Sequence, residues 1–103
     1  MRRNRELGKL KDNAGEAAEF LSLLANDKRL LILCELLEAQ EMSVGNLADA
    51  VGLSQSALSQ HLSKLRTEGL VETRRKSQTI FYKLSADERV AQELSLLKKL
   101  FCR

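Results

Sequence analysis

The spacing of hydrophobic residues is helical over most of the chain. Residues 14–26 repeat apolar positions every three or four residues and predict a first helix with one apolar face. The next helix is expected over residues 28–40, after Asp27 as its N-terminal cap. Its apolar residues lie on almost every side, which is typical of a helix buried at the centre of a domain.

Two shorter helices follow, separated by a sharp turn. Ser43 can cap a helix over residues 44–51, and Gly52 can supply the left-handed conformation that ends many helices. Ser54 can then cap a fourth helix that ends near Arg66. A pair of short helices joined by a tight turn that contains glycine predicts a helix-turn-helix.

Residues 70–76 and 79–85 read as two β-strands, joined by a short link that lacks the Asn-Gly sequence of a tight turn. A last helix is expected over residues 86–103, capped by Ser85 and carrying an apolar stripe: Val90, Leu94, Leu97 and Phe101. The expected fold class is therefore mainly α with a β-hairpin, in the arrangement of a winged helix-turn-helix.

Length and composition allow one domain, spanning residues 1–103. Hydrophobic residues make up 44% of the chain but aromatic residues only 4%, so the core is small and aliphatic. Such a core is marginal on its own, and we expect further burial against a second copy of the chain. Residues 1–11 are basic and lack a continuous apolar stretch, so they are expected to form a flexible basic arm.

Charge is unevenly distributed along the chain. Residues 1–11 hold five basic side chains against one acidic, residues 12–52 hold two against eight, and residues 53–84 hold six against two. A polyanion such as DNA would be attracted to the last of these segments and repelled by the middle one. Charges scattered by chance over solvated faces are the alternative explanation.

Residues 53–70, LSQSALSQHLSKLRTEGL, form the most informative stretch. Leu58, Leu62 and Leu65 recur at the spacing of one buried helix face. The other positions are short and mostly neutral: Gln55, Ser56, Ser59, Gln60, Ser63 and Lys64. Base edges in the major groove of DNA are neutral donors and acceptors, which glutamine and serine match without burying a charge. We therefore expect this helix to read base edges.

Neighbouring groups are expected to hold the phosphate backbone. Ser54 leaves the first amides of its helix available to a phosphate, and the hairpin tip carries a cluster of cations: Arg74, Arg75 and Lys76. A helix that faces only water would explain the serines but not the absence of acidic residues between positions 50 and 67. Double-stranded DNA is thus the expected partner.

Other classes of function are disfavoured. One histidine, two cysteines, no glycine-rich phosphate loop and no Cys-x-x-Cys pair give no catalytic constellation, so neither an enzyme nor a cofactor is expected. No run approaches the roughly 18 apolar residues that a membrane span requires. The chain is expected in the cytoplasm, where cysteines are normally reduced thiols.

Residues 24–85, from LANDKRLLILCELL to TIFYKLS, resemble the ArsR family of bacterial winged-helix repressors, most specifically over SQSALSQHLSKLRTEGLV. The resemblance implies a homodimer joined by its first and last helices, which binds an inverted-repeat operator and releases it on meeting an inducer. Arsenic sensors of the family open the third helix with a cysteine pair, where this sequence has Ser43 and Gly45. Zinc sensors use a histidine on the last helix, where this sequence has none. No metal site is therefore expected.

The two cysteines, Cys34 and Cys102, resemble those of the family's persulfide-sensing branch, which includes BigR, SqrR and HlyU-like regulators. The resemblance implies that reactive sulfur species join these thiols by a disulfide or polysulfide bridge, and that the bridged protein releases DNA. Three alternatives stay open: Cys34 as a small buried hydrophobe, a soft-metal site built from the two thiolates, and a winged-helix module that binds proteins instead of DNA.

Overall fold

The computed structural model describes residues 2–101, with side chains from Leu7 onward. Over these residues the chain forms five α-helices and three β-strands: α1 (Arg2–Leu24), α2 (Asp27–Ala39), β1 (Met42–Ser43), α3 (Val44–Val51), α4 (Gln55–Thr67), β2 (Val71–Lys76), β3 (Thr79–Leu84) and α5 (Glu88–Phe101). The expected fold class, mainly α with a β-hairpin in a winged helix-turn-helix, is confirmed.

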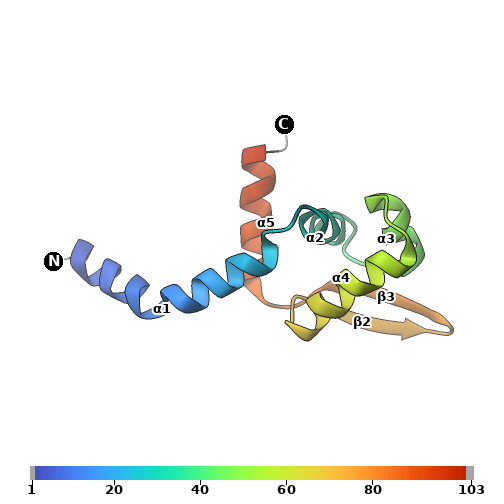
Figure 1. Cartoon of the computed structure of the whole chain (residues 1–103), viewed down its shortest axis with the longest axis horizontal. Helices are drawn as coiled ribbons and strands as arrows, with labels where there is room; N and C mark the ends of the chain where they lie inside the picture. The colour runs from blue at the N-terminus through green and yellow to red at the C-terminus, as the bar shows by residue number, and fades with distance from the viewer. Residues whose placement is uncertain (1, 102–103) are drawn as a thin grey trace.

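The molecule is elongated because its first and last helices leave the central body (Figure 1). Its radius of gyration is 15.7 Å, whereas a compact chain of this length has about 13 Å. α1 runs away from the body toward the N-terminus, and the C-terminal end of α5 also projects from it. Although α1 has 23 residues, no helix in the described part of the chain is long and apolar enough to cross a membrane.

Aliphatic side chains from all five helices and from β2 form the core. The most deeply buried are Ile32, Leu33, Leu36, Leu47, Leu58, Leu62, Leu65, Val90 and Leu94. Leucines 58, 62 and 65 are those expected on the inner face of α4, and three residues of α2 give that helix its central place. Burying one such side chain fully contributes about 1.5–3 kcal/mol. The helix-turn-helix is therefore held in place by its contacts with α2.

Polar side chains and one glycine set the ends of the middle helices. The hydroxyls of Ser43 and Ser54 each accept a backbone N–H from the first turn of their helices, at 3.3 and 3.1 Å, as expected of caps. Gly52 takes a left-handed φ of 69° at the end of α3. Asn26, and not the expected Asp27, caps α2, because the backbone of Asn26 is extended while Asp27 is already helical.

The N-terminal segment differs from the expected flexible arm. α1 begins at Arg2, so residues 2–11 are helical in the structure. Arginine, lysine, leucine and glutamate, which dominate this segment, all have high helix propensity. Leu7 and Leu10 lie one turn apart but are 57% and 58% exposed, so the core of the chain does not bury them.

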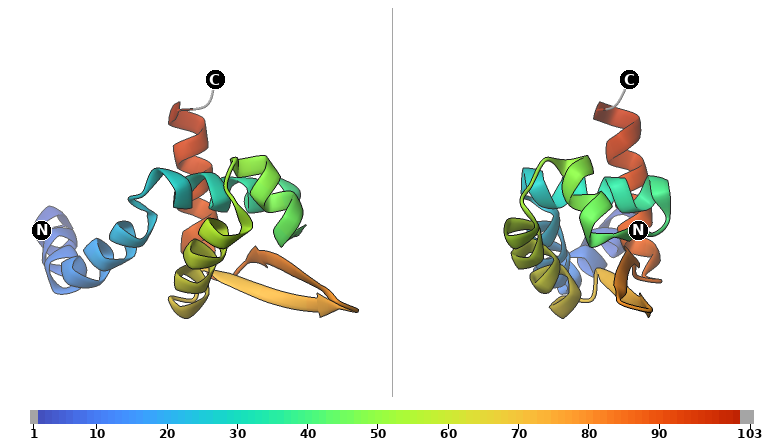
Figure 2. Two further views of the ribbon diagram at one scale, coloured as in Figure 1. Left: turned by 45° about the vertical axis from the view of Figure 1, so that its right-hand side comes forward. Right: turned by 90° about the vertical axis from the view of Figure 1, so that its right-hand side faces the viewer.

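A third strand, which the sequence did not predict, joins the hairpin. β1 pairs antiparallel with β3, Met42 opposite Tyr82 and Ser43 opposite Phe81, and gives the strand order β1-β3-β2. A strand of two residues is too short to show an alternating pattern. Ser77 takes a φ of 57° in the link between β2 and β3, so a tight turn forms there without glycine. The hairpin projects beyond the helices (Figure 2).

The start of α5 is shifted by two residues from the expected position. Ser85 lies before the helix: its N–H donates to the carbonyl of Leu70 at 2.9 Å, which keeps the chain against the start of β2, and its hydroxyl accepts the N–H of Asp87 at 3.4 Å. Asp87 takes the capping role instead, and its carboxylate accepts the N–H of Arg89 at 3.0 Å. α5 therefore begins at Glu88.

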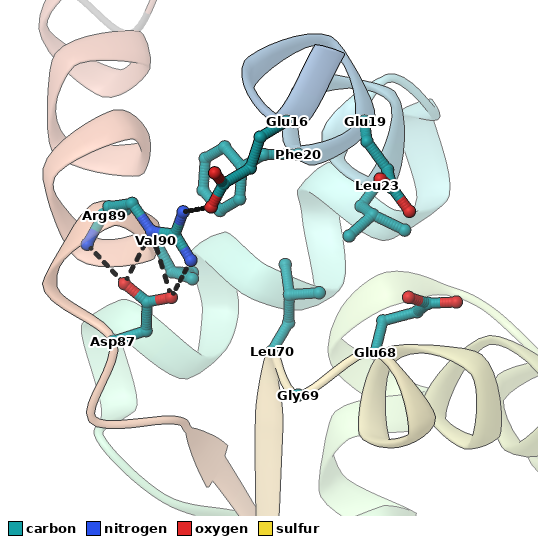
Figure 3. Close-up of a pocket in the computed structure, with 10 residues that line it drawn as sticks. All are labelled: Glu16, Glu19, Phe20, Leu23, Glu68, Gly69, Leu70, Asp87, Arg89 and Val90. Carbon is teal, nitrogen blue, oxygen red and sulfur yellow. Dashed lines mark hydrogen bonds and ion pairs between the residues drawn. The ribbon is translucent and has the colours of Figure 1, made fainter. Parts of the chain in front are cut away.

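Arg89 connects α5 to α1 (Figure 3). Its guanidinium donates to Asp87 at 2.7 Å and to Glu16 at 3.4 Å, and lies 5.0 Å from the centre of the Phe20 ring. The hydrogen bonds from Arg89 hold the pKa of Asp87 below its usual range. The stabilisation that Asp87 gains from Arg89 is therefore present at neutral pH and is lost as the pH falls through that lowered pKa.

Gly45 within α3 and Gly52 directly after it should respond in opposite ways to alanine. Gly52→Ala should lower the free energy of unfolding by about 1 kcal/mol, because alanine is strained at positive φ. Gly45→Ala should raise the free energy of unfolding by about 0.5 kcal/mol, because alanine lowers the conformational entropy of the unfolded chain. The added Cβ would meet only the Gln55 side chain, at 3.9 Å. Denaturant unfolding at one protein concentration measures both, and a stabilised Gly52→Ala protein would contradict the expectation.

Candidate nucleic-acid interface

The outer face of α4 is exposed along its length. Leu58, Leu62 and Leu65 are at most 1% exposed, which turns the residues between them outward. All the expected base-reading positions are exposed: Gln55, Ser56, Ser59, Gln60, Ser63 and Lys64. Because residues 50–67 contain no carboxylate, this face offers hydrogen-bonding groups and positive charge only.

The first turn of α4 lies against the start of α3. The Ser54 hydroxyl accepts the N–H of Ala57, which leaves its own O–H and the other first-turn amides as donors for a phosphate at this end. The side-chain nitrogen of Gln55 lies 3.9 Å from where a Cβ on Gly45 would be. The two helices of the motif thus share one surface at this end.

A polar groove of about 440 Å³ lies between α4 and the β2–β3 hairpin, which forms the wing of the fold. It is lined by Ser59, Ser63, Arg66, Thr67 and Tyr82. Arg66, Thr67 and Tyr82 were not among the expected site residues. The sequence could have suggested Arg66, because a cation in the last turn of α4 can reach a phosphate. It could not have suggested Tyr82, because only the tertiary fold brings Tyr82 beside α4. The groove therefore lies between the expected base-reading face of α4 and the hairpin.

Arg74 is engaged within the protein. Its Nε donates to Glu41 Oε2 at 3.1 Å and a terminal nitrogen donates to Oε1 at 2.5 Å, while its guanidinium carbon lies 5.0 Å from the centre of the Phe81 ring. The hydrogen bonds hold the pKa of Glu41 below its usual range and raise that of Arg74. A phosphate contact by Arg74, as expected from the sequence, would have to break this pair.

The other two expected wing cations are available. Arg75 and Lys76 are exposed near the tip of the hairpin. No ion pair involves either of them among the side chains that the structure describes. They are therefore better placed than Arg74 to meet the phosphate backbone.

Cys34 lies half-buried on α2, at a pocket between α2 and the end of α5. The pocket has a volume of about 320 Å³ and is lined by Leu30, Cys34, Leu97, Lys98 and Phe101. Cys102, the second expected sensing residue, lies outside the described residues, although its chain neighbour Phe101 is part of the pocket. The ammonium of Lys98 forms an ion pair with Glu38 of α2, so the pair joins α5 to α2 beside the pocket.

Metal-ligand geometry is not found in the part of the chain that the structure describes. There, no three histidine, cysteine, aspartate or glutamate side chains are placed to hold a metal ion. A soft-metal site would therefore need Cys102 or a second copy of the chain in addition to Cys34.

Known proteins resemble the chain over most of its length. Residues 26–73 match the arsR family of bacterial regulatory proteins. The transcriptional activator HlyU of Vibrio cholerae is 48% identical over 97 residues, which are 94% of this chain and 88% of that protein. The nodulation protein NolR of Rhizobium meliloti is 63% identical over 76 residues, which are 74% of this chain and 62% of that protein.

Two solved structures share the fold. Reduced HlyU from Vibrio cholerae has a TM-score of 0.83 at 48% identity, covering 92% of this chain and 98% of that one. The transcriptional repressor BigR from Xylella fastidiosa has a TM-score of 0.85 at 40% identity, covering 93% and 96%. HlyU and BigR are regulators of transcription and not enzymes. The chain therefore belongs to the arsR family of bacterial regulatory proteins, with the winged helix-turn-helix of its relatives.

Proposed function

We propose that the protein is a homodimeric transcriptional repressor that releases operator DNA when Cys34 and Cys102 become bridged by sulfur. The carboxylate-free outer face of α4, beside the exposed cations of the wing, is the observation that carries DNA binding. The pocket that Cys34 shares with the end of α5 supports the switch. HlyU is named an activator and BigR a repressor, and the resemblance to ArsR repressors favours repression here.

The contacts with DNA divide into two kinds. Side chains on the outer face of α4 read base edges in the major groove: Gln55, Ser56, Ser59 and Gln60. Lys64, Arg75 and Lys76 hold the phosphate backbone, and Ser54 keeps the first amides of α4 directed at a phosphate. Backbone contacts supply affinity and register, whereas base contacts distinguish one sequence from another.

Exposed hydrophobic side chains support a second copy as the partner. On α1 and α5, large apolar residues are about half exposed or more: Leu7, Leu10, Leu21, Leu96, Leu100 and Phe101. Leu96 and Leu100 lie one turn apart, on the same side of α5 as Arg89, which contacts α1. Apolar patches of this kind mark protein interfaces. A symmetric dimer would present two α4 helices to half-sites of an inverted repeat about one helical turn apart.

The switch begins with two thiols in the cytoplasm, where we propose that the protein acts. A low-molecular-weight persulfide, R–S–SH, transfers its outer sulfur to the Cys34 thiolate and leaves as R–S⁻. The Cys102 thiolate then attacks Sγ of Cys34, the inner sulfur of the new persulfide, which forms the disulfide and releases the outer sulfur as HS⁻. Two thiols are oxidised while one persulfide is reduced to a thiol and hydrogen sulfide. The polysulfide form requires a second R–S–SH, which first transfers its outer sulfur to Cys102 and leaves as R–S⁻. The outer sulfur on Cys102 then attacks Sγ of Cys34 and releases HS⁻, which leaves a trisulfide bridge.

The bridge would join two helices with different tasks. α2 supplies the core against which α3 and α4 pack, and α5 carries part of the proposed dimer surface. Joining them can therefore change the spacing of the two recognition helices in the dimer. A 100-fold loss of operator affinity requires a free-energy difference of about 2.7 kcal/mol between the binding and non-binding arrangements. One covalent bond can supply this difference.

Base readout can be tested on a selected duplex, obtained by enriching random-sequence DNA on the wild-type protein. Gln55→Ala should reduce discrimination between this duplex and a scrambled duplex, by about 1–3 kcal/mol if the contact is bidentate. Ser59→Ala should act in the same direction with a smaller effect. Dissociation constants for both duplexes measure the change.

Arg75→Ala is the matched control for base readout. It should weaken both duplexes similarly and reduce the slope of log affinity against log salt by about 0.9. If Gln55→Ala also weakened both duplexes equally, the assignment of Gln55 to base readout would be wrong.

The dimer surface can be tested by adding a charge to it. Leu100→Glu should convert the dimer to monomer at micromolar concentration and weaken operator binding, because it buries a carboxylate in an apolar interface. Ser95→Glu adds the same charge on another side of α5 and should remain dimeric. Analytical ultracentrifugation gives both results. A wild-type monomer that binds the selected duplex with full affinity would exclude the dimer.

The switch predicts a specific response to persulfide. Reduced wild-type protein should bind the selected duplex without added metal, and glutathione persulfide should lower its affinity about 100-fold. Intact mass should show the loss of two hydrogens for a disulfide, or additional sulfur for a longer bridge. Cys34→Ser and Cys102→Ser should both stay bound to DNA under the same treatment.

Parallel treatments distinguish the alternatives to the bridge. Normal release of the Cys34→Ser protein by persulfide would contradict the bridge. Release of the wild type by zinc or cadmium, with no change in covalent mass, would identify a soft-metal sensor instead. Hydrogen peroxide in place of persulfide tests whether oxidation without sulfur transfer is sufficient.

A further inference from the structure

Arg74 lies on the face of the hairpin that points away from α4. Side chains alternate between the two faces of a strand. Tyr82 borders the groove with Ser59 and Ser63 of α4, so its neighbour Phe81 lies on the opposite face. Arg74 is the cross-strand partner of Phe81 and lies over its ring. A strand residue cannot change face without a shift of register, so Arg74 is held away from the groove.

Glu41, the partner of Arg74, stands directly before β1. The pairing of β1 with β3 involves only two residues of β1, so this edge of the sheet has few hydrogen bonds. Arg74 on β2 crosses over Phe81 on β3 and donates to both carboxylate oxygens of Glu41. Arg74, Phe81 and Glu41, which we name the wing clasp, thus connect β2, β3 and the residue before β1.

We propose that the wing clasp positions the wing for DNA binding and that Arg74 is a positioning residue, not a phosphate contact. β1 ends at Ser43, which is also the cap of α3. The clasp therefore fixes the angle between the hairpin and the helix-turn-helix. In that position Arg75, on the opposite face of β2, and Lys76, at the hairpin tip, reach the backbone while α4 occupies the major groove. The proposal rests on operator binding by this chain, but it does not depend on the thiol switch.

A purely electrostatic role and a positioning role for the Glu41–Arg74 pair predict opposite changes in DNA affinity when the pair is removed. If Glu41 acted only by charge, removing it would tighten DNA binding, because the carboxylate repels phosphates and competes with them for Arg74. The double variant Glu41→Ala/Arg74→Ala removes the clasp without changing the net charge. Exposed ion pairs contribute little to global stability, so this variant should remain folded. Its DNA affinity therefore reports on positioning.

The chain offers a matched control on the same face of the hairpin. Glu72 and Lys83 form an ion pair between β2 and β3 at 3.9 Å. The positive charge of Lys83 also acts on Glu41, but Glu41 takes its side-chain hydrogen bonds from Arg74. Glu72→Ala/Lys83→Ala should bind the selected duplex as the wild type does. The clasp double variant should bind roughly threefold to tenfold more weakly, a modest coupling effect. Arg74→Ala alone should leave the salt slope unchanged, whereas Arg75→Ala should lower it by about 0.9.

Amide hydrogen exchange without DNA gives a second, independent readout. The amides of β1 and β3 should exchange faster in the clasp double variant than in the control, while the melting temperature stays the same. Equal exchange in the two variants, or wild-type affinity in the clasp variant, would overturn the proposal. A salt slope that falls in Arg74→Ala as in Arg75→Ala would make Arg74 a phosphate contact. If the wild-type protein enriched no sequence from random DNA, both the proposed operator binding and the proposed role of the wing clasp would be wrong.

Discussion

Burial of one leucine row decides how this molecule can meet DNA. Leu58, Leu62 and Leu65 pack into a core shared with α2 and α3, and this packing sets the rotation of α4 about its own axis. Each helical residue turns the chain by about 100°, so fixing the leucines also fixes the direction of every serine and glutamine between them. The orientation of the proposed base-reading face is thus a consequence of core packing. A repacked core would redirect that face even if no outward residue changed.

α2 connects three features that are separate in the sequence. Its buried side supports α3 and α4, its Cys34 lines the pocket at the end of α5, and the chain that leaves it supplies Glu41 to the wing clasp. Gln40, at the end of this helix, has a φ of 71° and turns the chain sharply toward β1. A displacement of α2 would therefore reach both the recognition helix and the wing. One helix thus links the proposed thiol switch to the elements that we propose bind DNA.

Local patterns predicted most of the fold, and contacts between distant residues account for most of the differences. The caps at Ser43 and Ser54 depend on neighbouring residues and were recognised from them. The pairing of Arg74 with Glu41 joins residues 33 positions apart, and nothing local marks it. A run of cations shows charge but not the strand face on which each cation lies, so the sequence predicted Arg74, Arg75 and Lys76 alike as phosphate contacts.

The site residues of α4 and the wing were predictable to different degrees. A helix period assigns outward positions directly, and all six of those expected on α4 are exposed. A hairpin period also assigns faces, but which face borders α4 depends on the tertiary arrangement that brings Tyr82 to the groove. The two cysteines were paired by resemblance, and only Cys34 lies within the described residues.

Ser43 belongs to two elements at once, as the last residue of β1 and the cap of α3. No linker therefore separates the small sheet from the helix-turn-helix, and a change in the angle of one cannot be absorbed before it reaches the other. Loops elsewhere in such a domain can lengthen at little thermodynamic cost. An insertion between β1 and α3 would instead let the wing move independently of the recognition helix. The length of the segment between α2 and α3 therefore matters for the relative position of these two elements.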